Sequence, residues 1–264
     1  MTQNDSFEAV TCDIRSQIAL VTLNRPQVLN AIDHQVFTDL KELFCQLADD
    51  PEVRVILLTG SGEKAFAAGA DINELTSLDR ANGQSLSQRG QSIFRQIETC
   101  GKPVIALING FALGGGCELA LACTLRLASS TAQLGLPEAR LGLIPGYGGT
   151  QRLPRLIGPS AALKLLLTGE RIDAAEALRL GLVDEVVSPD QLLERGKQLA
   201  ESILKVAPLA VAGCLEAVNK GLSHDLDSAL EIESRIFGRL CETADRAEGT
   251  QAFLEKRPPH WTGR

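Results

Sequence analysis

Two glutamates of this 264-residue chain stand in apolar, glycine-rich segments, where charged side chains are rare unless they are paired or functional. Glu118 follows three glycines and precedes Leu119-Ala120-Leu121, and Glu138 follows Pro137. Burial and mutual repulsion raise the pKa of one such carboxyl, so a protonated acid can stand beside an ionised base at neutral pH. The pair points to acid–base chemistry, although for Glu118 alone a structural salt bridge is an equal alternative.

Two segments of small residues could bind a developing negative charge. Ala67–Ile72 follows a predicted strand, and Asn109–Ala120 joins a strand to the expected start of a helix. Unpaired N–H groups at a helix start carry the positive end of its dipole, which suits an oxyanion. Simple loops and tight strand–helix packing also explain such glycines. A Rossmann phosphate loop is not favoured, because G-x-G-x-x-G does not occur.

Apolar runs and the 3–4 spacing of apolar residues predict the elements that position these segments. Strands are expected at Ile18–Leu23, Val53–Thr59, Pro103–Ile108 and Leu125–Ala128, and helices at Asp33–Asp49, Ser87–Thr99, from Ser188 onward and over much of Glu231–Phe253. Gly60–Asp71 is expected to be a loop. From Gly148 onward the pattern is helical, except for a short apolar segment at Leu182–Val187. Strands that alternate with helices indicate an α/β fold.

Composition excludes several classes of protein. A net charge of −7 argues against a general nucleic-acid or anionic-membrane binder. Seven cysteines without C-x-x-C pairs and three scattered histidines favour neither a disulfide framework nor a metal site, and suit the reducing cytoplasm. Met1–Ala9 has no basic or apolar region typical of a secretory signal. The apolar stretch Pro103–Cys123 contains Asn109, Glu118 and several glycines, so a membrane span is not expected.

Five segments together resemble the signatures of the crotonase (enoyl-CoA hydratase/isomerase) family, in that family's order and spacing. They are Leu23–Pro26 with Leu29–Ala31, Ala67–Ile72, Asn109–Ala120, Gly135–Leu153 and Ala252–Arg257. The likeness runs from Ile18 to Arg257. It implies an α/β spiral of stacked ββα turns within residues 1–200, followed by a helical trimerisation region at residues 201–264, often in a dimer of trimers.

The resemblance also implies roles for individual residues. The backbone N–H groups of Ala70 and Gly115 would hold the thioester oxygen of an acyl-CoA, Glu118 would deprotonate water, and Glu138 would protonate C2. Further contacts to the substrate are expected from Arg25, Val28, Ala68, Asp71, Ile72, Asn73 and Gly146, and from Lys256 toward a neighbouring subunit. Asn73 stands where some hydratases carry Lys, and Lys256 could equally be part of a solvated tail. No metal or redox cofactor is implied.

Retention of both glutamates favours a 2-enoyl-CoA hydratase within this family. The alternatives are a Δ3,Δ2-enoyl-CoA isomerase, a hydratase of branched substrates such as 3-methylglutaconyl-CoA, and a non-catalytic CoA-binding homologue. Tyr147 could narrow the acyl pocket, offer a hydroxyl or face solvent. The polar segment Ser77–Gly90 is expected to be mobile and to set acyl length. Asp33–Asp49 holds only Lys41 as a basic residue beside its histidine, so RNA binding is set aside.

Overall fold

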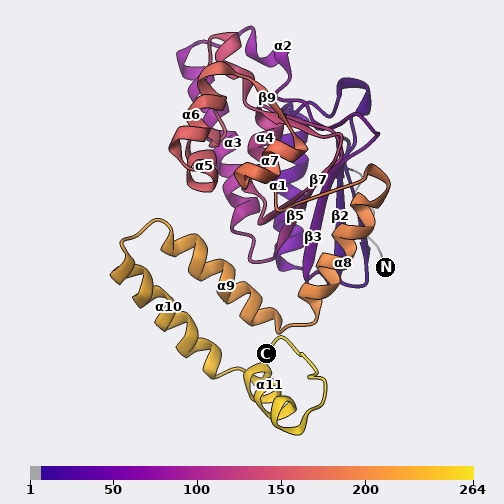
Figure 1. Cartoon of the computed structure of the whole chain (residues 1–264), viewed down its shortest axis with the longest axis vertical. Helices are drawn as coiled ribbons and strands as arrows, with labels where there is room; N and C mark the ends of the chain where they lie inside the picture. The colour runs from indigo at the N-terminus through magenta and orange to yellow at the C-terminus, as the bar shows by residue number, and fades with distance from the viewer. Residues whose placement is uncertain (1–6) are drawn as a thin grey trace.

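Three buried apolar runs in the first half of the chain are each followed by a second, shorter strand, and the two strands enter different sheets. The computed structural model, which describes residues 7–264, contains two sheets with helices around them (Figure 1). The larger sheet has the order β1 (Val10–Arg15), β2 (Ile18–Leu23), β3 (Val55–Gly60), β5 (Val104–Ile108), β7 (Leu125–Ser129) and β10 (Glu185–Val187). The smaller has the order β4 (Ala65–Ala67), β6 (Phe111–Leu113), β8 (Gln133–Gly135) and β9 (Arg171–Asp173).

The connections form a spiral. β3, β5 and β7 are parallel neighbours in one sheet, and their successors β4, β6 and β8 are parallel neighbours in the other. Only β1 with β2 and β8 with β9 are antiparallel among the pairs of named strands in the described residues. The chain therefore repeats a strand–strand–helix turn without any sequence repeat, and the predicted α/β spiral is confirmed.

Eleven α-helices lie in the described part of the chain, with short 3₁₀ turns η1 (Pro26–Val28), η2 (Pro137–Leu141) and η3 (Pro189–Gln191). The helices are α1 (His34–Asp49), α2 (Ile72–Leu75), α3 (Arg80–Glu98), α4 (Gly115–Ala122), α5 (Gly149–Ile157), α6 (Pro159–Thr168), α7 (Ala174–Leu180), α8 (Leu192–Leu204), α9 (Pro208–Gly221), α10 (Leu226–Cys241) and α11 (Ala244–Glu255). None of these helices, which are those of residues 7–264, is long and apolar enough to cross a bilayer.

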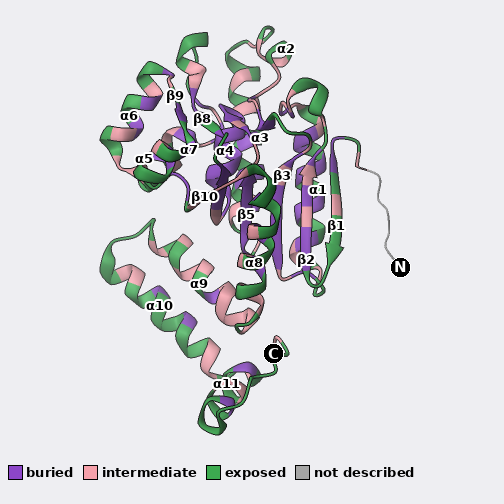
Figure 2. Ribbon diagram, turned by 45° about the vertical axis from the view of Figure 1, so that its right-hand side comes forward, coloured by how far each residue is buried: buried purple, intermediate pink, exposed green. Residues whose placement is uncertain are grey.

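The larger sheet is covered on both faces because its central strands are apolar at nearly every position. On β3, Ile56 and Leu58 join the main core, whereas Val55 and Leu57 belong to a second cluster with Leu192 on α8. This division follows the alternation of side chains along a strand. Figure 2 shows the buried strands enclosed between helices.

The last three helices extend away from the sheets. α9 and α10 form an antiparallel pair beside the core, and α11 lies at its far end near the carboxyl terminus (Figure 1). Most contacts of α10 are to α9 rather than to the sheets. A separate helical region at residues 201–264 remains a prediction.

Several sequence-based boundaries were wrong. The expected loop Gly60–Asp71 contains β4, and the expected mobile segment Ser77–Gly90 lies mostly in α3, which begins at Arg80 after the capping residue Asp79. The helix expected over Glu231–Phe253 is interrupted, because Thr243 caps α11 by accepting from Arg246 N–H. Strands β1, β4, β6, β8 and β9 were not predicted, since four of them have only three residues and β1 is largely exposed. Met1–Ala9 lies mostly outside the described residues.

Candidate active site

Glu118 is held in the first turn of α4, where the glycine-rich segment brings the helix close to a strand. Gly114 caps this helix with a φ of 51°, a conformation that favours glycine. A Cβ placed on Gly116 would lie 2.0 Å from the carbonyl oxygen of Ala67 on β4. Only glycine at position 116 therefore lets α4 approach β4 this closely.

We predict that Gly116→Ala destabilises the fold, because the new methyl group meets backbone that cannot rotate away. Overpacking of this kind costs about 1–3 kcal/mol, and the displacement of α4 should also lower any activity that needs Glu118. The measurement is thermal unfolding with Gly83→Ala as the control, since a Cβ there meets nothing within 4 Å. Equal unfolding temperatures for wild type and Gly116→Ala would contradict this account of the packing.

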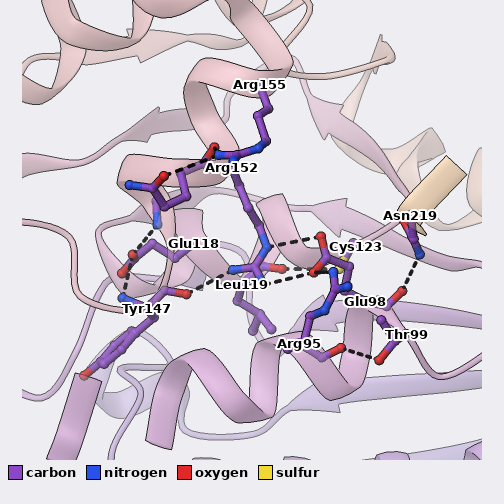
Figure 3. Close-up of polar contacts among 12 residues, drawn as sticks. Arg95, Glu98, Thr99, Glu118, Leu119, Cys123, Tyr147, Arg152, Arg155 and Asn219 are labelled. Carbon is purple, nitrogen blue, oxygen red and sulfur yellow. Dashed lines mark hydrogen bonds and ion pairs between the residues drawn. The ribbon is translucent and has the colours of Figure 1, made fainter. Parts of the chain in front are cut away.

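The carboxylate of Glu118 is fixed by backbone donors from a second glycine-rich turn, Gly146–Gly149. Its side chain is 1% exposed, and Oε1 accepts from Tyr147 N–H at 2.8 Å and Gly149 N–H at 2.7 Å (Figure 3). Among the described residues no donor reaches Oε2. Oε2 is thus the oxygen available to take a proton.

Glu138 reaches toward the same helix start from the 3₁₀ turn η2. A Cβ on Gly114 would lie 2.9 Å from Glu138 Oε1, so the side chain stands against the cap of α4. Its other oxygen, Oε2, is buried and has no hydrogen-bond partner among the described residues. A buried oxygen without a donor favours the protonated acid.

The two carboxyl groups have similar pKa values but different surroundings. Burial raises the pKa of each to about 7, and for Glu118 the proximity of Glu138 adds to this increase. The N–H groups of Gly149 and Tyr147 oppose the shift in the pKa of Glu118 by stabilising its charge. These donors favour the negative charge on Glu118 and leave the proton to Glu138.

Two backbone N–H groups lie beside this pair. Ala70 forms an isolated β-bridge with Ile32, but the hydrogen bonds of this bridge are made by the carbonyl oxygen of Gly69 and the N–H of Asp71. Gly115 is the first residue of α4. Neither N–H donates to any acceptor in the described chain. A Cβ on Gly115 would lie 3.5 Å from Ala70 N, so the backbones of these two residues lie side by side.

A cavity of about 890 Å³ opens onto these groups. Seven residues singled out from the sequence line it, namely Ala68, Ala70, Ile72, Gly115, Glu118, Glu138 and Gly146. Leu78 and Leu86, from the segment expected to set acyl length, also contribute apolar wall. Tyr147 is another wall residue, 5% exposed and edge-on to Phe37 and Phe94, so it does not face solvent.

Five other candidate contact residues do not line this cavity: Arg25, Val28, Asp71, Asn73 and Lys256. Arg25 forms an ion pair with Asp33 at 2.8 Å and donates to Ala31 O, while Asp71 caps α2 and accepts from the Asn73 side chain. Lys256 ends α11, which Figure 1 shows at the opposite end of the molecule from α2. Their contacts to substrate stay predictions.

Cys117, beside the catalytic candidate Glu118, is a packing residue. It is 1% exposed, and burial together with the adjacent carboxyl groups raises the pKa of its thiol to about 12. A thiol that stays protonated at neutral pH is a poor nucleophile. Burial and the protonated thiol are consistent with packing and not with nucleophilic attack by Cys117.

The charged groups that contact the second glycine-rich turn were not predicted from the sequence. Arg152 donates to the carbonyl oxygen of Tyr147 and forms an ion pair with Glu98 (Figure 3). An arginine three residues after a glycine pair was the available signal. Its partner Glu98 lies 54 positions earlier in the sequence, which no local pattern reveals.

Comparison with known proteins identifies relatives of the whole chain. The sequence model described as enoyl-CoA hydratase/isomerase matches residues 13–264. A short-chain-enoyl-CoA hydratase of Clostridium acetobutylicum is 44% identical over 94% of this chain and 95% of its own length. A crotonyl-CoA hydratase of Syntrophomonas wolfei is 45% identical over 96% of this chain and 97% of its own. The crystal structure of an enoyl-CoA hydratase from Bacillus anthracis superposes with a TM-score of 0.94 at 40% identity, covering 97% of this chain and 100% of that one.

Proposed function

The chain belongs to the enoyl-CoA hydratase/isomerase family and is an enoyl-CoA hydratase, a hydro-lyase, and we propose that Glu118 and Glu138 together catalyse its reaction on short trans-2-enoyl-CoA thioesters. One observation carries the assignment of these residues. Two carboxyl groups with raised pKa values share one cavity, and only one of them accepts backbone N–H groups from the second glycine-rich turn. Hydration needs such a pair, because water must lose a proton while C2 gains one.

The proposed reaction begins with the thioester oxygen between the N–H groups of Ala70 and Gly115. Glu118 Oε2 removes a proton from water as the water oxygen bonds to C3. The C2–C3 π electrons move toward the carbonyl and generate an enolate, which the two N–H groups stabilise. Glu138 then gives its proton to C2, and the product is a 3-hydroxyacyl-CoA. Glu118 ends protonated and Glu138 ionised, so a proton exchange with solvent restores the starting state.

The direct test is incubation of the pure protein with crotonyl-CoA while the conjugated enoyl absorbance is followed. Loss of absorbance with formation of 3-hydroxybutyryl-CoA is expected. A protein inert on crotonyl-CoA and on other short 2-enoyl thioesters, but active on 3-enoyl thioesters, would contradict hydration and favour isomerisation.

We predict a bell-shaped pH profile for kcat/KM with its maximum near neutral pH. The active form carries one proton on the pair. Below the pKa range near 7 both carboxyls are protonated and the base is lost, and above it both are ionised and the acid is lost. Initial rates with crotonyl-CoA across about pH 5–9 check this. A flat profile over that range would contradict the assigned pair.

A preference for short acyl chains is proposed from the wall of the cavity. The ring of Tyr147 fills space beside α3, since a Cβ on Gly90 would lie 2.2 Å from it. The names of the two hydratases described above, from C. acetobutylicum and S. wolfei, agree with short substrates. Ser77–Gly90, although mostly helical, is proposed to influence acyl length through Leu78 and Leu86.

Assembly into trimers or a dimer of trimers is also proposed, through the extended helices. Large apolar side chains on α10 and α11 are exposed in the single chain, including Phe237 at 70% and Phe253 at 83%. Lys256, at the end of α11, would then be free to meet the CoA of a neighbouring subunit. Sedimentation velocity decides the assembly state.

The seven unpaired cysteines support the proposed cytoplasmic location.

A further inference from the structure

Arg152 holds the glycine-rich turn that binds Glu118, without touching Glu118 itself. It lies in the first turn of α5, and Nη1 donates to the Tyr147 carbonyl oxygen at 3.0 Å. The N–H of the same residue, Tyr147, donates to Glu118 Oε1. Tyr147 is therefore fixed at both its amide nitrogen and its carbonyl oxygen, with the catalytic carboxylate on one side and the guanidinium on the other (Figure 3).

The position of Arg152 is itself fixed by Glu98 at the end of α3. Arg152 Nη2 lies 3.1 Å from Glu98 Oε2 and Arg152 Nε lies 3.3 Å from Glu98 Oε1, so the ion pair is bidentate. The Arg152 side chain is only 16% exposed. Gly148, with a φ of 113°, leaves the space the guanidinium needs, because a Cβ there would lie 2.3 Å from Nη1. Turn, guanidinium and carboxylate thus fit as one unit.

Glu98 is anchored from two further directions. Arg95, 53% exposed, pairs with its carboxylate at 2.8 Å, and Asn219 on α9 donates to its backbone carbonyl oxygen at 3.0 Å. Burial alone would raise the pKa of Glu98, but hydrogen bonds and charge from Arg152 and Arg95 lower it below its usual value. Glu98 thus stays ionised at neutral pH and can hold Arg152 throughout the reaction.

We propose that Arg152, fixed by Glu98, is a positioning residue that holds the Tyr147–Gly149 turn so that its two N–H groups keep Glu118 oriented and ionised. This inference rests on the proposed role of Glu118 as the base. Without Arg152 the Tyr147–Gly149 turn could shift by about 1 Å, and its N–H groups would then orient the Glu118 carboxylate poorly. A misplacement of this size can lower the rate about 10²-fold.

Electrostatics act in the same direction. The groups that face Glu118 are Glu138 from η2, Arg152 from α5, Tyr147 from the turn and the neutral thiol of Cys117 on α4. Of these only Arg152 carries positive charge, and it lowers the pKa of Glu118. Its removal should therefore leave Glu118 both less well oriented and easier to protonate.

The test compares Arg152→Gln and Arg152→Lys with the control Arg195→Gln. Arg195 on α8 forms a bidentate pair with Glu185, as Arg152 does with Glu98, but it does not line the cavity and makes no bond to Tyr147. For crotonyl-CoA hydration we expect kcat about 10²-fold lower in Arg152→Gln with KM little changed, a partial recovery in Arg152→Lys, and near-wild-type rates in Arg195→Gln. The acidic limb of the pH profile should move to higher pH in Arg152→Gln alone.

A readout independent of turnover is the infrared titration of protonated carboxyl groups, with Glu118→Gln as the subtracted reference. The midpoint for Glu118 should rise in Arg152→Gln and not in Arg195→Gln. Unchanged kcat and an unchanged Glu118 midpoint in folded Arg152→Gln would overturn the proposal, and so would equal losses in Arg195→Gln. A wild type inert on crotonyl-CoA would instead contradict the proposed function, while the titration still decides whether Arg152 controls Glu118.

Discussion

Replacement of Glu138 by glutamine is expected to lower kcat for crotonyl-CoA hydration by about 10⁴-fold, the upper end of what a positioned acid contributes. Glutamine matches the shape of glutamate, but its amide cannot deliver a proton to C2. The buried Oε2 has no hydrogen-bond partner in the described chain, so no neighbouring group can take over this step. Initial rates of absorbance loss, with protein concentration raised to compensate, measure the effect.

The matched control is Glu42→Gln, which removes an exposed carboxylate on α1 and should leave kcat within about twofold. Circular dichroism and thermal unfolding establish that both variants are folded. Because Glu138 carries a buried carboxyl with a raised pKa, its replacement should not destabilise the fold above about pH 7. A folded Glu138→Gln protein with a loss of about tenfold or less would show that another group supplies the proton.

Replacement of Glu118 by glutamine is expected to lower the same kcat by about 10³-fold. The amide oxygen of the new side chain can still accept from the N–H groups of Tyr147 and Gly149, so the turn should keep its position. The atom at the place of Oε2 becomes an amide nitrogen, which cannot take a proton from water. The loss should therefore lie in kcat, with binding of the thioester, measured by calorimetry with a saturated acyl-CoA, nearly unchanged.

This variant also separates hydration from isomerisation. An isomerase that moves one proton between C2 and C4 needs a single acid, so Glu118→Gln would retain activity on a 3-enoyl-CoA. The double variant Glu118→Gln/Glu138→Gln should lose little more than the worse single variant, since both groups are needed to complete the same addition and act as a unit. A fully additive loss would contradict this joint role of the pair.

Local sequence was sufficient for much of the fold. The apolar runs at β2, β3 and β5 and the spaced apolar face of α1 are visible in the sequence, because burial on both faces of a strand or on one face of a helix leaves a pattern within a few residues. The three-residue strands of the second sheet leave no such pattern. These strands exist because β4, β6 and β8 pair with one another, and their predecessors β3, β5 and β7 are neighbours in the larger sheet.

The chemistry divides in the same way. The sequence by itself indicated Glu118 and Glu138 as candidate carboxyl groups, since an acid in an apolar segment is a local fact, and the resemblance to the crotonase family indicated Ala70 and Gly115 as backbone donors. Only the tertiary structure decided their environments. The donors to Glu118 come from residues 29 and 31 positions away, and Arg152 finds Glu98 across 54 positions. Hydrogen bonds between residues so far apart in sequence, together with burial, favour ionisation of one carboxyl group over the other. Both depend on how the turns of the spiral stack and not on residues adjacent in the sequence.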